Sequence, residues 1–376
     1  MLLNDDQIMV RDAVRAFVRE EVTPHAAQWD RQHHFPHEVH QGLAALGAYG
    51  ICVPTEYGGA GLDYLSLALV LEEIAAGDGG TSTAISVTNC PVNAILMRYG
   101  SPAQKRQWLE PLAQGHMLGA FCLTEPHVGS DASALRTTAR KQGDDYVLNG
   151  VKQFITSGKN GQVAIVIAVT DAQAGKKGMS AFLVPTNQPG YHVERLEEKL
   201  GQHSSDTAQI RLEDCRIPAE NLIGQEGEGY KIALSSLEGG RIGIASQSVG
   251  MARAAFEVAV QYAKERESFG TAIVNHQAVG FRLAECDMQI EAARQLIWHA
   301  ASLRDAGQPC LREAAMAKLF ASEMAERVCS VAIQTLGGYG YVNDFPVERI
   351  YRDVRVCQIY EGTSDVQKIL IQRALM

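Results

Sequence analysis

The stretch RVCQIYEGTSDVQK, residues 355–368, sets one carboxylate, Glu361, at the end of a mostly apolar run. Gly362 follows it, and glycine is the residue type with the widest backbone freedom. Two interpretations fit these residues. Either Thr363 or Ser364 caps a helix and Glu361 lies in solvent, or Glu361 is a general base in a dry pocket.

The second interpretation makes a chemical demand on the carboxylate. An unperturbed glutamate has a pKa of about 4.3, which makes it a poor base for a C–H bond. Burial among Ile359, Tyr360 and an apolar substrate would disfavour the charged form and raise that pKa. General-base catalysis works best when the pKa of the base lies near the operating pH, so burial would favour catalysis. The stretch alone leaves both interpretations open.

Four other stretches combine hydroxyl, aromatic and glycine residues at the ends of predicted elements. Each also has a plain structural explanation: a strand-to-loop exit, a strand end, a helix–turn–helix corner and a helix C-cap. The glycines among them allow close approach of the backbone to a ligand. The stretches are AFCLTEPHVGSDAS (120–133), KQFITSGKNG (152–161), KERESFGTAIVNHQAV (264–279) and QTLGGYGY (334–341).

Several familiar catalytic and cofactor motifs are absent from the sequence. It contains no P-loop, no G-x-G-x-x-G opening a βαβ unit, no H-E-x-x-H and no G-x-S-x-G. His33, His34, His37 and His40 lie at spacings that metal ligands use. Because they fall at the predicted start of a helix, a solvated helix end is the favoured interpretation, and we expect no metal site.

Composition limits the class of protein. The 376 residues carry a formal net charge of −9, which argues against a nucleic-acid surface, although a few local cations and backbone donors suffice for a phosphate-bearing cofactor. The eight cysteines form no C-x-x-C pair, so we interpret them as reduced. Acids stand where a signal peptide would be apolar, and no apolar run reaches about 18 residues. We therefore expect no membrane insertion and a cytoplasmic protein, with a mature mitochondrial-matrix form as the alternative.

The elements that must position these residues fall into three blocks. Residues 1–118 repeat apolar positions at helical spacing and predict an N-terminal helical domain, in which Ser101 and Pro102 would be the N-cap and first residue of a helix. Residues 119–228 hold short β-branched segments bounded by Gly, Pro, Asn or Asp, and predict a small β-domain of barrel or sandwich type. Residues 229–376 predict three long helices and a short last one, a C-terminal four-helix bundle. The fold class is thus α+β, mostly α.

The joint order of five motifs resembles the acyl-CoA dehydrogenase family of flavoproteins, of short-chain or short/branched-chain type. The motifs are LTEPHVGSDAS, FITSGKNG, RESFG, QTLGGYGY and IYEGTSDVQ, and the resemblance covers essentially the whole chain. It implies FAD-dependent α,β-dehydrogenation of an acyl-CoA to the trans-2-enoyl-CoA. Electrons would pass to an electron-transfer flavoprotein, in fatty acid β-oxidation or branched-chain amino acid catabolism. It also implies a homotetramer.

The resemblance assigns residues to the FAD. Thr124 would hydrogen-bond the flavin ring, Phe154 would cover one face of it, and Thr156 would lie near its reactive nitrogen. The RESFG segment would hold the pyrophosphate, and the QTLGG segment would reach the FAD of a neighbouring subunit. The full implied set is Phe121, Leu123, Thr124, Ser130, Phe154, Thr156, Arg266, Ser268, Phe269, Gln277, Gln334, Gly337, Gly338, Thr363 and Asp365.

The resemblance also assigns the base and the substrate contacts. Glu361 would remove the α-proton while the flavin takes the β-hydride. Some family members carry the base immediately before the arginine that corresponds to Arg241, but here that position is Gly240. Arg241 would lie beside the CoA adenine. The implied substrate-binding residues are Ser130, Glu238, Arg241, Tyr360, Glu361 and Gly362.

Alternatives remain within and outside this family. An oxidase of the same fold would give its electrons to oxygen, although such oxidases usually carry a longer C-terminal extension. A non-catalytic flavin-bearing or helical binding protein is the alternative from another class, and the net charge and Glu361 count against it. The acyl group, its length and branching, is not encoded in any pattern of the sequence; a short or branched acyl group is the expected substrate.

Overall fold

Helices make up the N-terminal part of the chain in the computed structural model, which describes residues 2–376. Asn4 caps the first helix through a capping box with Gln7, and Ser101 does the same with Gln104, with Pro102 at the first helical position as expected. Short π-helical turns extend three of these helices. The α-helices are α1 (Asp5–Phe17), α2 (Ala26–Gln32), α3 (His37–Ala45), α4 (Tyr64–Gly77), α5 (Gly79–Val87), α6 (Ala94–Tyr99), α7 (Pro102–Gln104) and α8 (Glu110–Ala113), and the π-helical turns are η1 (Val18–Val22), η3 (Thr88–Asn93) and η4 (Lys105–Leu109).

The predicted β-region is confirmed, but it is not a closed barrel. Its strands form one sheet in the order β6-β7-β3-β2-β4-β5-β8, with β1 pairing β4 in parallel. The sheet stays open because β6 and the two-residue β8 are its edges, and β2 meets β4 through one residue pair. The strands are β1 (Gly119–Cys122), β2 (Thr138–Gln142), β3 (Asp145–Thr156), β4 (Val163–Val169), β5 (Met179–Pro185), β6 (Tyr191–Leu196), β7 (Thr207–Pro218) and β8 (Leu222–Ile223).

Strand β4 explains why the sheet is buried on both faces. Its sequence VAIVIAV is apolar throughout, so alternate residues serve two cores. Val163, Ile165 and Ile167 pack in one core together with N-terminal helices. Ala164 and Val166 pack in the other core, which lies within the β-region.

Three long helices build the C-terminal part, as predicted. Alanines line their shared core, which lets the helix backbones approach closely. The expected fourth helix, α14, is short and packs against α11. The elements are α9 (Gly229–Glu265), the hairpin strands β9 (Glu267–Ser268) and β10 (Thr271–Ala272), α10 (Gln277–Asp305), α11 (Leu311–Leu336), α12 (Gly338–Tyr341), α13 (Val347–Val354) and α14 (Ser364–Arg373).

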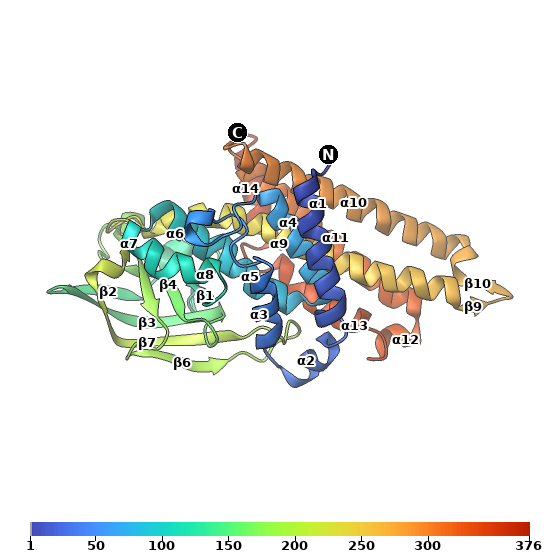
Figure 1. Ribbon diagram of the computed structural model, residues 1–376, viewed down its shortest axis with the longest axis horizontal. Coiled ribbons are helices and arrows are strands. Elements are labelled where there is room, and N and C mark those ends of the chain that lie inside the picture. The colour runs from blue at the N-terminus through green and yellow to red at the C-terminus, as the bar shows by residue number, and fades with distance from the viewer. Residues whose placement is uncertain (1) are drawn as a thin grey trace.

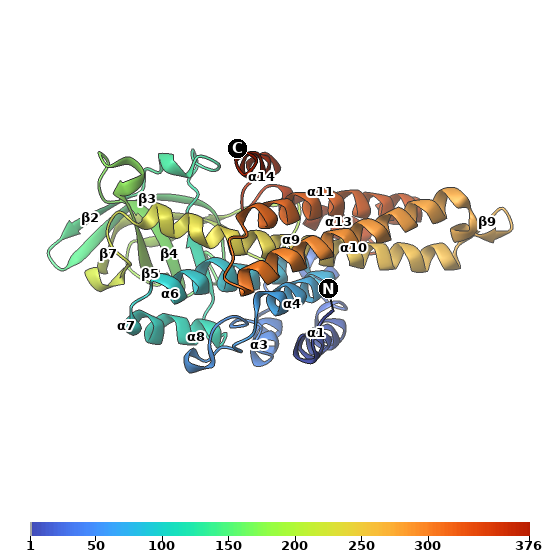
Figure 2. The same cartoon turned by 90° about the horizontal axis from the view of Figure 1, so that it is seen from above.

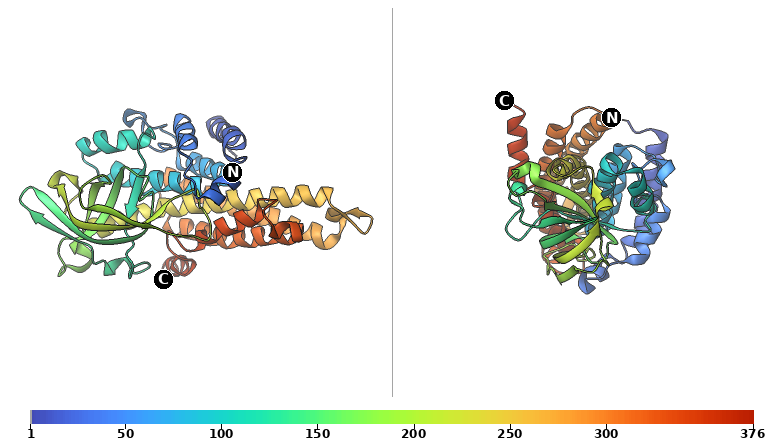
Figure 3. Two further views of the ribbon diagram at one scale, coloured as in Figure 1. Left: turned by 90° about the horizontal axis from the view of Figure 1, so that it is seen from below. Right: turned by 90° about the vertical axis from the view of Figure 1, so that its left-hand side faces the viewer.

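Helix α9 is the axis of the molecule. It begins beside β5, where Gly229 lies against Ser180, and ends at the β9–β10 hairpin at the opposite end from the sheet (Figures 1 and 2). At about 1.5 Å per residue its 37 residues span about 55 Å. The N-terminal helices cover one side of α9, and α11 and α14 lie on the other (Figure 3). None of the described helices is long and apolar enough to cross a bilayer.

Candidate active site

The carboxylate of Glu361 lies directly against α9. Its Oε2 atom is buried and has no hydrogen-bond partner within residues 2–376. A Cβ atom built on Gly240 would lie only 2.6 Å from that oxygen, so a glycine at this position makes room for the carboxylate. Glu361 itself has a left-handed backbone, with φ +54°, which is unfavourable for a residue with a side chain. The side chain is therefore aimed into the interior at a cost to the local backbone.

Burial and charge act on Glu361 in opposite directions. Burial raises the pKa of Glu361 to about 7, while Arg241 and Lys318 pull it down. Arg241 is only 5 % exposed, and its Nε and Nη1 atoms have no hydrogen-bond partner in the described chain. Burial lowers the pKa of Arg241, and the charges of Glu361 and Glu238 oppose that shift. Because Arg241 lies beside the carboxylate, a role next to Glu361 is favoured. The expected contact of Arg241 with the CoA adenine stays a prediction.

The loop after the carboxylate is held from two helices. Thr363 caps α14 by accepting a hydrogen bond from the Val366 N–H at 3.4 Å, so the capping interpretation is right for the hydroxyl. It is wrong for Glu361, whose carboxylate does not lie in solvent. The Gly362 carbonyl accepts from Lys318 Nζ at 2.7 Å and from Gln367 Nε2 at 2.8 Å. A wholly buried lysine therefore touches the loop that carries the carboxylate.

Tyr360 anchors this loop in a polar network. Its hydroxyl donates to Gln247 Oε1 at 3.0 Å and lies 3.4 Å from both the Thr83 hydroxyl and Gln202 Nε2. Burial raises the pKa of the Tyr360 phenol. The Tyr360 hydroxyl is thus hydrogen-bonded within the protein. A substrate contact through the ring or backbone of Tyr360 stays a prediction.

Two of the predicted FAD stretches meet on the sheet. Gln153 N–H donates to the Thr124 carbonyl at 2.9 Å, which brings the stretch 120–133 against the stretch 152–161. β3 has a bulge between Lys152 and Ile155, and within it Phe154 has φ +60° and a 62 % exposed side chain. Ser130 of this group is exposed. The other members are partly buried: Phe121, Leu123, Thr124 and Thr156.

A second group of predicted FAD residues lies at the far end of the helical bundle. The β9–β10 hairpin lies at the tip of the bundle (Figure 2) and turns through Phe269, a residue that is 98 % exposed. The Tyr262 and Tyr339 rings lie 6.3 Å apart and connect the end of α9 to α12. This second group is Arg266, Ser268, Phe269, Gln277, Gln334, Gly337 and Gly338. One chain therefore does not bring the two groups together.

Glu238 and Asp365 have partners of their own. Glu238 accepts from Arg304 Nη1 at 3.1 Å and from Cys310 Sγ at 3.2 Å. Arg304 in turn lies over the Tyr64 ring. Asp365 is exposed on the first turn of α14. Their expected substrate and cofactor contacts remain predictions.

Sequence reasoning missed Lys318 and the pair formed by Lys152 and Glu125. Lys152 is fully buried, and its ammonium donates to Glu125 at 2.9 Å and to the Leu123 carbonyl at 3.1 Å. Both lysines interrupt apolar stretches, in β3 and in α11. A charged residue on a predicted buried face was the available signal, because such a residue needs a partner in the interior.

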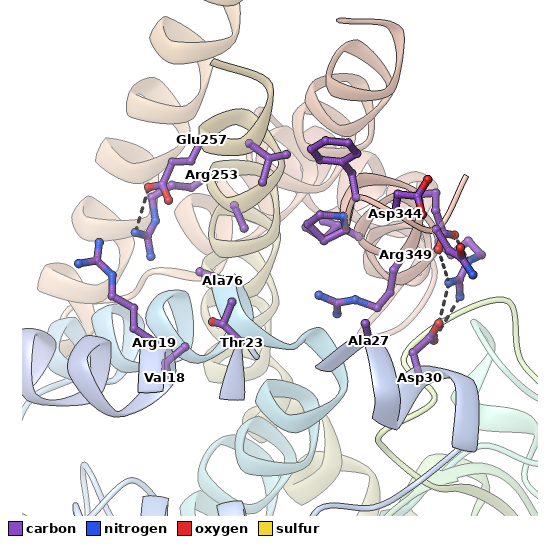
Figure 4. Close-up of a pocket in the computed structure, with 18 of the residues that line it drawn as sticks. Val18, Arg19, Thr23, Ala27, Asp30, Ala76, Arg253, Glu257, Asp344 and Arg349 are labelled. Carbon is purple, nitrogen blue, oxygen red and sulfur yellow. Dashed lines mark hydrogen bonds and ion pairs between the residues drawn. The ribbon is translucent and has the colours of Figure 1, made fainter. Parts of the chain in front are cut away.

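A cavity of about 560 Å³ lies away from Glu361, between the N-terminal helices and α13 (Figure 4). No predicted site residue lines it. Its buried or partly buried guanidiniums are already matched to carboxylates, in the pairs Arg15–Glu73, Arg253–Glu73, Arg349–Asp353 and Arg352–Asp30. The buried and partly buried cations of this cavity are therefore already neutralised.

The histidine cluster does not assemble into a site. His40 bonds the Tyr49 hydroxyl and stacks on Phe35, and His33 stacks on His203. Within residues 2–376, no three His, Cys, Asp or Glu side chains are grouped as a metal site would require.

Three family models match successive parts of the chain. The "Acyl-CoA dehydrogenase, N-terminal domain" model matches residues 4–116, the middle-domain model residues 120–215, and the C-terminal-domain model residues 227–376. The short-chain specific acyl-CoA dehydrogenase of Rattus norvegicus mitochondria is 46% identical over 368 residues, which is 98% of this chain and 89% of that protein.

Solved structures agree with this assignment. Butyryl-CoA dehydrogenase from Megasphaera elsdenii superposes with a TM-score of 0.98 at 41% identity, covering 100% of this chain and 99% of that one. A chain solved with the electron transferring flavoprotein of Acidaminococcus fermentans superposes with a TM-score of 0.99 at 44% identity, with the same coverage. The chain therefore belongs to the acyl-CoA dehydrogenase family and is an enzyme of that family.

Proposed function

We propose that this enzyme oxidises a short-chain acyl-CoA to the trans-2-enoyl-CoA, with Glu361 as the base that removes the α-proton. The observation that carries the proposal is the buried, unpartnered Oε2 of Glu361 against Gly240. A buried carboxylate that no other group satisfies is costly to the fold, so a role in binding or catalysis accounts for it.

Glu361 has two groups to offer a thioester. Its carboxylate, with a pKa near 7, takes up a proton readily around neutral pH. Its backbone N–H donates to no acceptor within the described residues, so it is free to hydrogen-bond the thioester oxygen. Such a bond stabilises the negative charge that develops on the oxygen as the α-proton leaves. Glu361 would then both make the α-proton more acidic, through its N–H, and remove that proton, through its carboxylate.

The exposed surface around Phe154 fits a flavin. The bulge in β3 turns this ring outward beside Thr124, and Phe121 and Leu123 add apolar area. Carbonyl and hydroxyl groups of the same strands offer the ring polar contacts. Bound there, FAD would accept the hydride that leaves the β-carbon of the substrate. The chain itself supplies orientation and excludes water.

A second subunit completes this cofactor site in our proposal. Arg266, next to the hairpin, is exposed and makes no ion pair in the described part of the chain. Its guanidinium is therefore available to bind a phosphate. A Cβ built on Gly337 or Gly338 meets nothing within 4 Å, so open space lies beside this backbone. Because these groups lie at the end of the bundle far from the sheet that carries Phe154 (Figure 1), a neighbouring chain would bring them to the flavin. A homotetramer satisfies this requirement.

The proposed short acyl group rests on the packing of α9. One turn beyond Gly240, a Cβ on Gly243 would lie 2.8 Å from Ser86 Oγ, 3.1 Å from Cys90 Sγ and 3.3 Å from a Leu71 methyl. The backbone of α9 therefore rests directly on α4, α5 and η3, which leaves little depth next to Glu361. The names of the rat and Megasphaera relatives point the same way.

A panel of acyl-CoAs tests the substrate. We expect kcat/KM for butyryl-CoA to exceed that for octanoyl-CoA by about tenfold or more, since a closed pocket penalises extra methylenes. Equal or higher kcat/KM with octanoyl-CoA would contradict a short pocket. Isobutyryl-CoA in the same panel separates a straight from a branched acyl group.

The proposed electron acceptor is an electron-transfer flavoprotein. The likeness to a chain solved with such a flavoprotein supports this choice. Turnover is measured with electron-transfer flavoprotein and, separately, with oxygen alone. Rapid turnover with the flavoprotein and slow turnover in oxygen is the expected result. The reverse order would make the enzyme an oxidase.

A further inference from the structure

The peptide that follows the base has an unfavourable conformation. Glu361 has φ +54° and Gly362 has φ +87°, two successive left-handed residues. Glycine adopts this conformation freely, but glutamate does not. The loop therefore needs contacts that hold it, because the same backbone sets the direction of both the carboxylate and the N–H of Glu361.

Two buried side chains from different helices supply those contacts. Lys318 of α11 donates to the Gly362 carbonyl at 2.7 Å, and Gln367 of α14 donates to it at 2.8 Å. Gln367 also donates to the Glu361 carbonyl at 3.2 Å. Lys318 and Gln367 are both 0% exposed. Both carbonyls next to the left-handed residues are thus held from inside the protein.

Hydrogen bonding alone does not account for a lysine at this place. The neutral amide of Gln367 already satisfies the Gly362 carbonyl, and a buried ammonium is expensive to desolvate. The charged and titratable groups that act on Lys318 are Glu361, Cys357, Arg241 of α9 and Glu323 of its own helix. Glu361 is the group among them that the proposed reaction requires in its ionised form.

We propose that Lys318 is a positioning residue for the base: it holds the Glu361–Gly362 peptide in place and stabilises the ionised carboxylate with its positive charge. This inference rests on the proposed role of Glu361. Lys318 would contribute in two ways. Like Gln367, it donates a hydrogen bond to the loop; unlike Gln367, it also carries a positive charge.

Comparison of Lys318→Met with Gln367→Met separates the effect of the hydrogen bond from the effect of the charge. Both variants weaken the hold on the loop, so kcat with the best acyl-CoA falls by roughly 10- to 100-fold at nearly unchanged KM. In Lys318→Met the acid limb of kcat/KM against pH also moves to higher pH, because the ionised base loses a neighbouring cation. In Gln367→Met that limb stays in place. Lys231→Met, at an exposed lysine near the start of α9, is the control and behaves as wild type.

Each outcome decides the proposal. Lys318→Met with wild-type kcat and an unmoved acid limb would mean that Lys318 only fills the core, and the proposal would be wrong. If Lys318→Met does not fold, Lys318→Arg retains the charge and is expected to keep the acid limb while lowering kcat. An unchanged kcat in Gln367→Met would remove the argument that the loop must be held.

The test also separates this inference from the proposed function. If no acyl-CoA reduces the wild type, or if Glu361→Gln is as active as wild type, the proposed function fails first. If the wild type is active, Glu361→Gln is inactive and Lys318→Met is normal, only the role of Lys318 is lost.

Discussion

Glu361 combines burial, which opposes its charge, with two cations that favour it. Neither Arg241 nor Lys318 forms a direct ion pair with the carboxylate in the described chain, so the carboxylate is not locked in its ionised form. A tight pair would have lowered the pKa of Glu361 and made its carboxylate a weaker proton acceptor. The arrangement leaves a carboxylate that titrates near neutral pH and remains free to reach a substrate.

The first prediction at this scale concerns pH. Because only the ionised carboxylate removes a proton, kcat/KM should rise with pH and level off above the pKa of the free enzyme, about 7. The measurement is kcat/KM for the best acyl-CoA from pH 5 to 9. A profile flat down to pH 5 would contradict a base with a raised pKa.

The second prediction concerns stability. The folded pKa of Glu361 lies above its unfolded value, so the folded state binds the extra proton and loses stability as pH rises between the two values. That loss is absent below about pH 4.5 and complete above about pH 7. Glu361→Gln cannot titrate here, so its Tm relative to wild type should be higher at pH 8 than at pH 5. Calorimetry at both pH values checks this, and an equal difference at the two would refute it.

At the scale of elements, α9 makes the site possible by lacking side chains where other elements approach. Gly239 faces the Tyr64 hydroxyl, Gly240 faces Glu361 and Gly243 faces Ser86. Glycines lower helix propensity, so the burial of α9 among neighbouring helices has to compensate. The helix thereby lies close to the base over more than one turn.

Gly240→Ala tests this view of α9. The new Cβ would lie 2.6 Å from the end of a flexible side chain, which can swing away, and alanine favours the helix by roughly 1 kcal/mol. We expect a folded protein with an unchanged or higher Tm and a kcat lowered by about 10- to 100-fold. Ser246→Ala on the same helix adds no atom and serves as the control. Full activity in Gly240→Ala would show that the carboxylate does not need this space.

Local patterns predicted most elements well. The period of apolar residues gave α9, α10 and α11, and Ser101 with Pro102 marked a helix start, because these signals lie within a few residues of each other. Strand β2, the bulge at Phe154 and the parallel pairing of β1 with β4 were not predicted. These features depend on partners distant in the sequence. The openness of the sheet has the same origin.

The same limit applies to the site. The apolar run before Glu361 left burial and solvent exposure both open, and the resemblance to the family favoured the buried base. The sequence did not reveal that Gly240 would lie against it, 121 positions earlier. Lys318 follows the spacing of Ala314, Ala321 and Ala325 on the buried face of α11, but its contact with Gly362 depends on how two helices pack.

At the scale of the whole molecule, the length of α9 separates the two groups of residues that we propose to bind FAD. The sheet that carries Phe154 lies toward one end of α9, and the hairpin that carries Phe269 follows the other end of this helix of about 55 Å (Figure 1). In our proposal, therefore, one chain does not supply both groups to the same flavin. Oligomerisation is then a requirement of the proposed chemistry and not only of stability.

Mixing variants tests this requirement. Phe154→Ala and Arg266→Ala should each weaken FAD retention when present in every subunit. Co-expressed, they should form mixed oligomers in which an intact sheet of one chain meets an intact hairpin of another, so FAD and activity return. FAD absorbance per chain and kcat of the purified mixture are the measurements. No recovery in mixed oligomers would mean that one chain holds the cofactor alone.

The most direct test of the account is anaerobic reduction of the purified, FAD-loaded enzyme by butyryl-CoA, followed at the flavin absorbance bands. The wild type should bleach, and Glu361→Gln with FAD still bound should bleach slower by about 10²- to 10⁴-fold, the usual contribution of a general base. Equal rates in the two proteins would show that Glu361 is not the base.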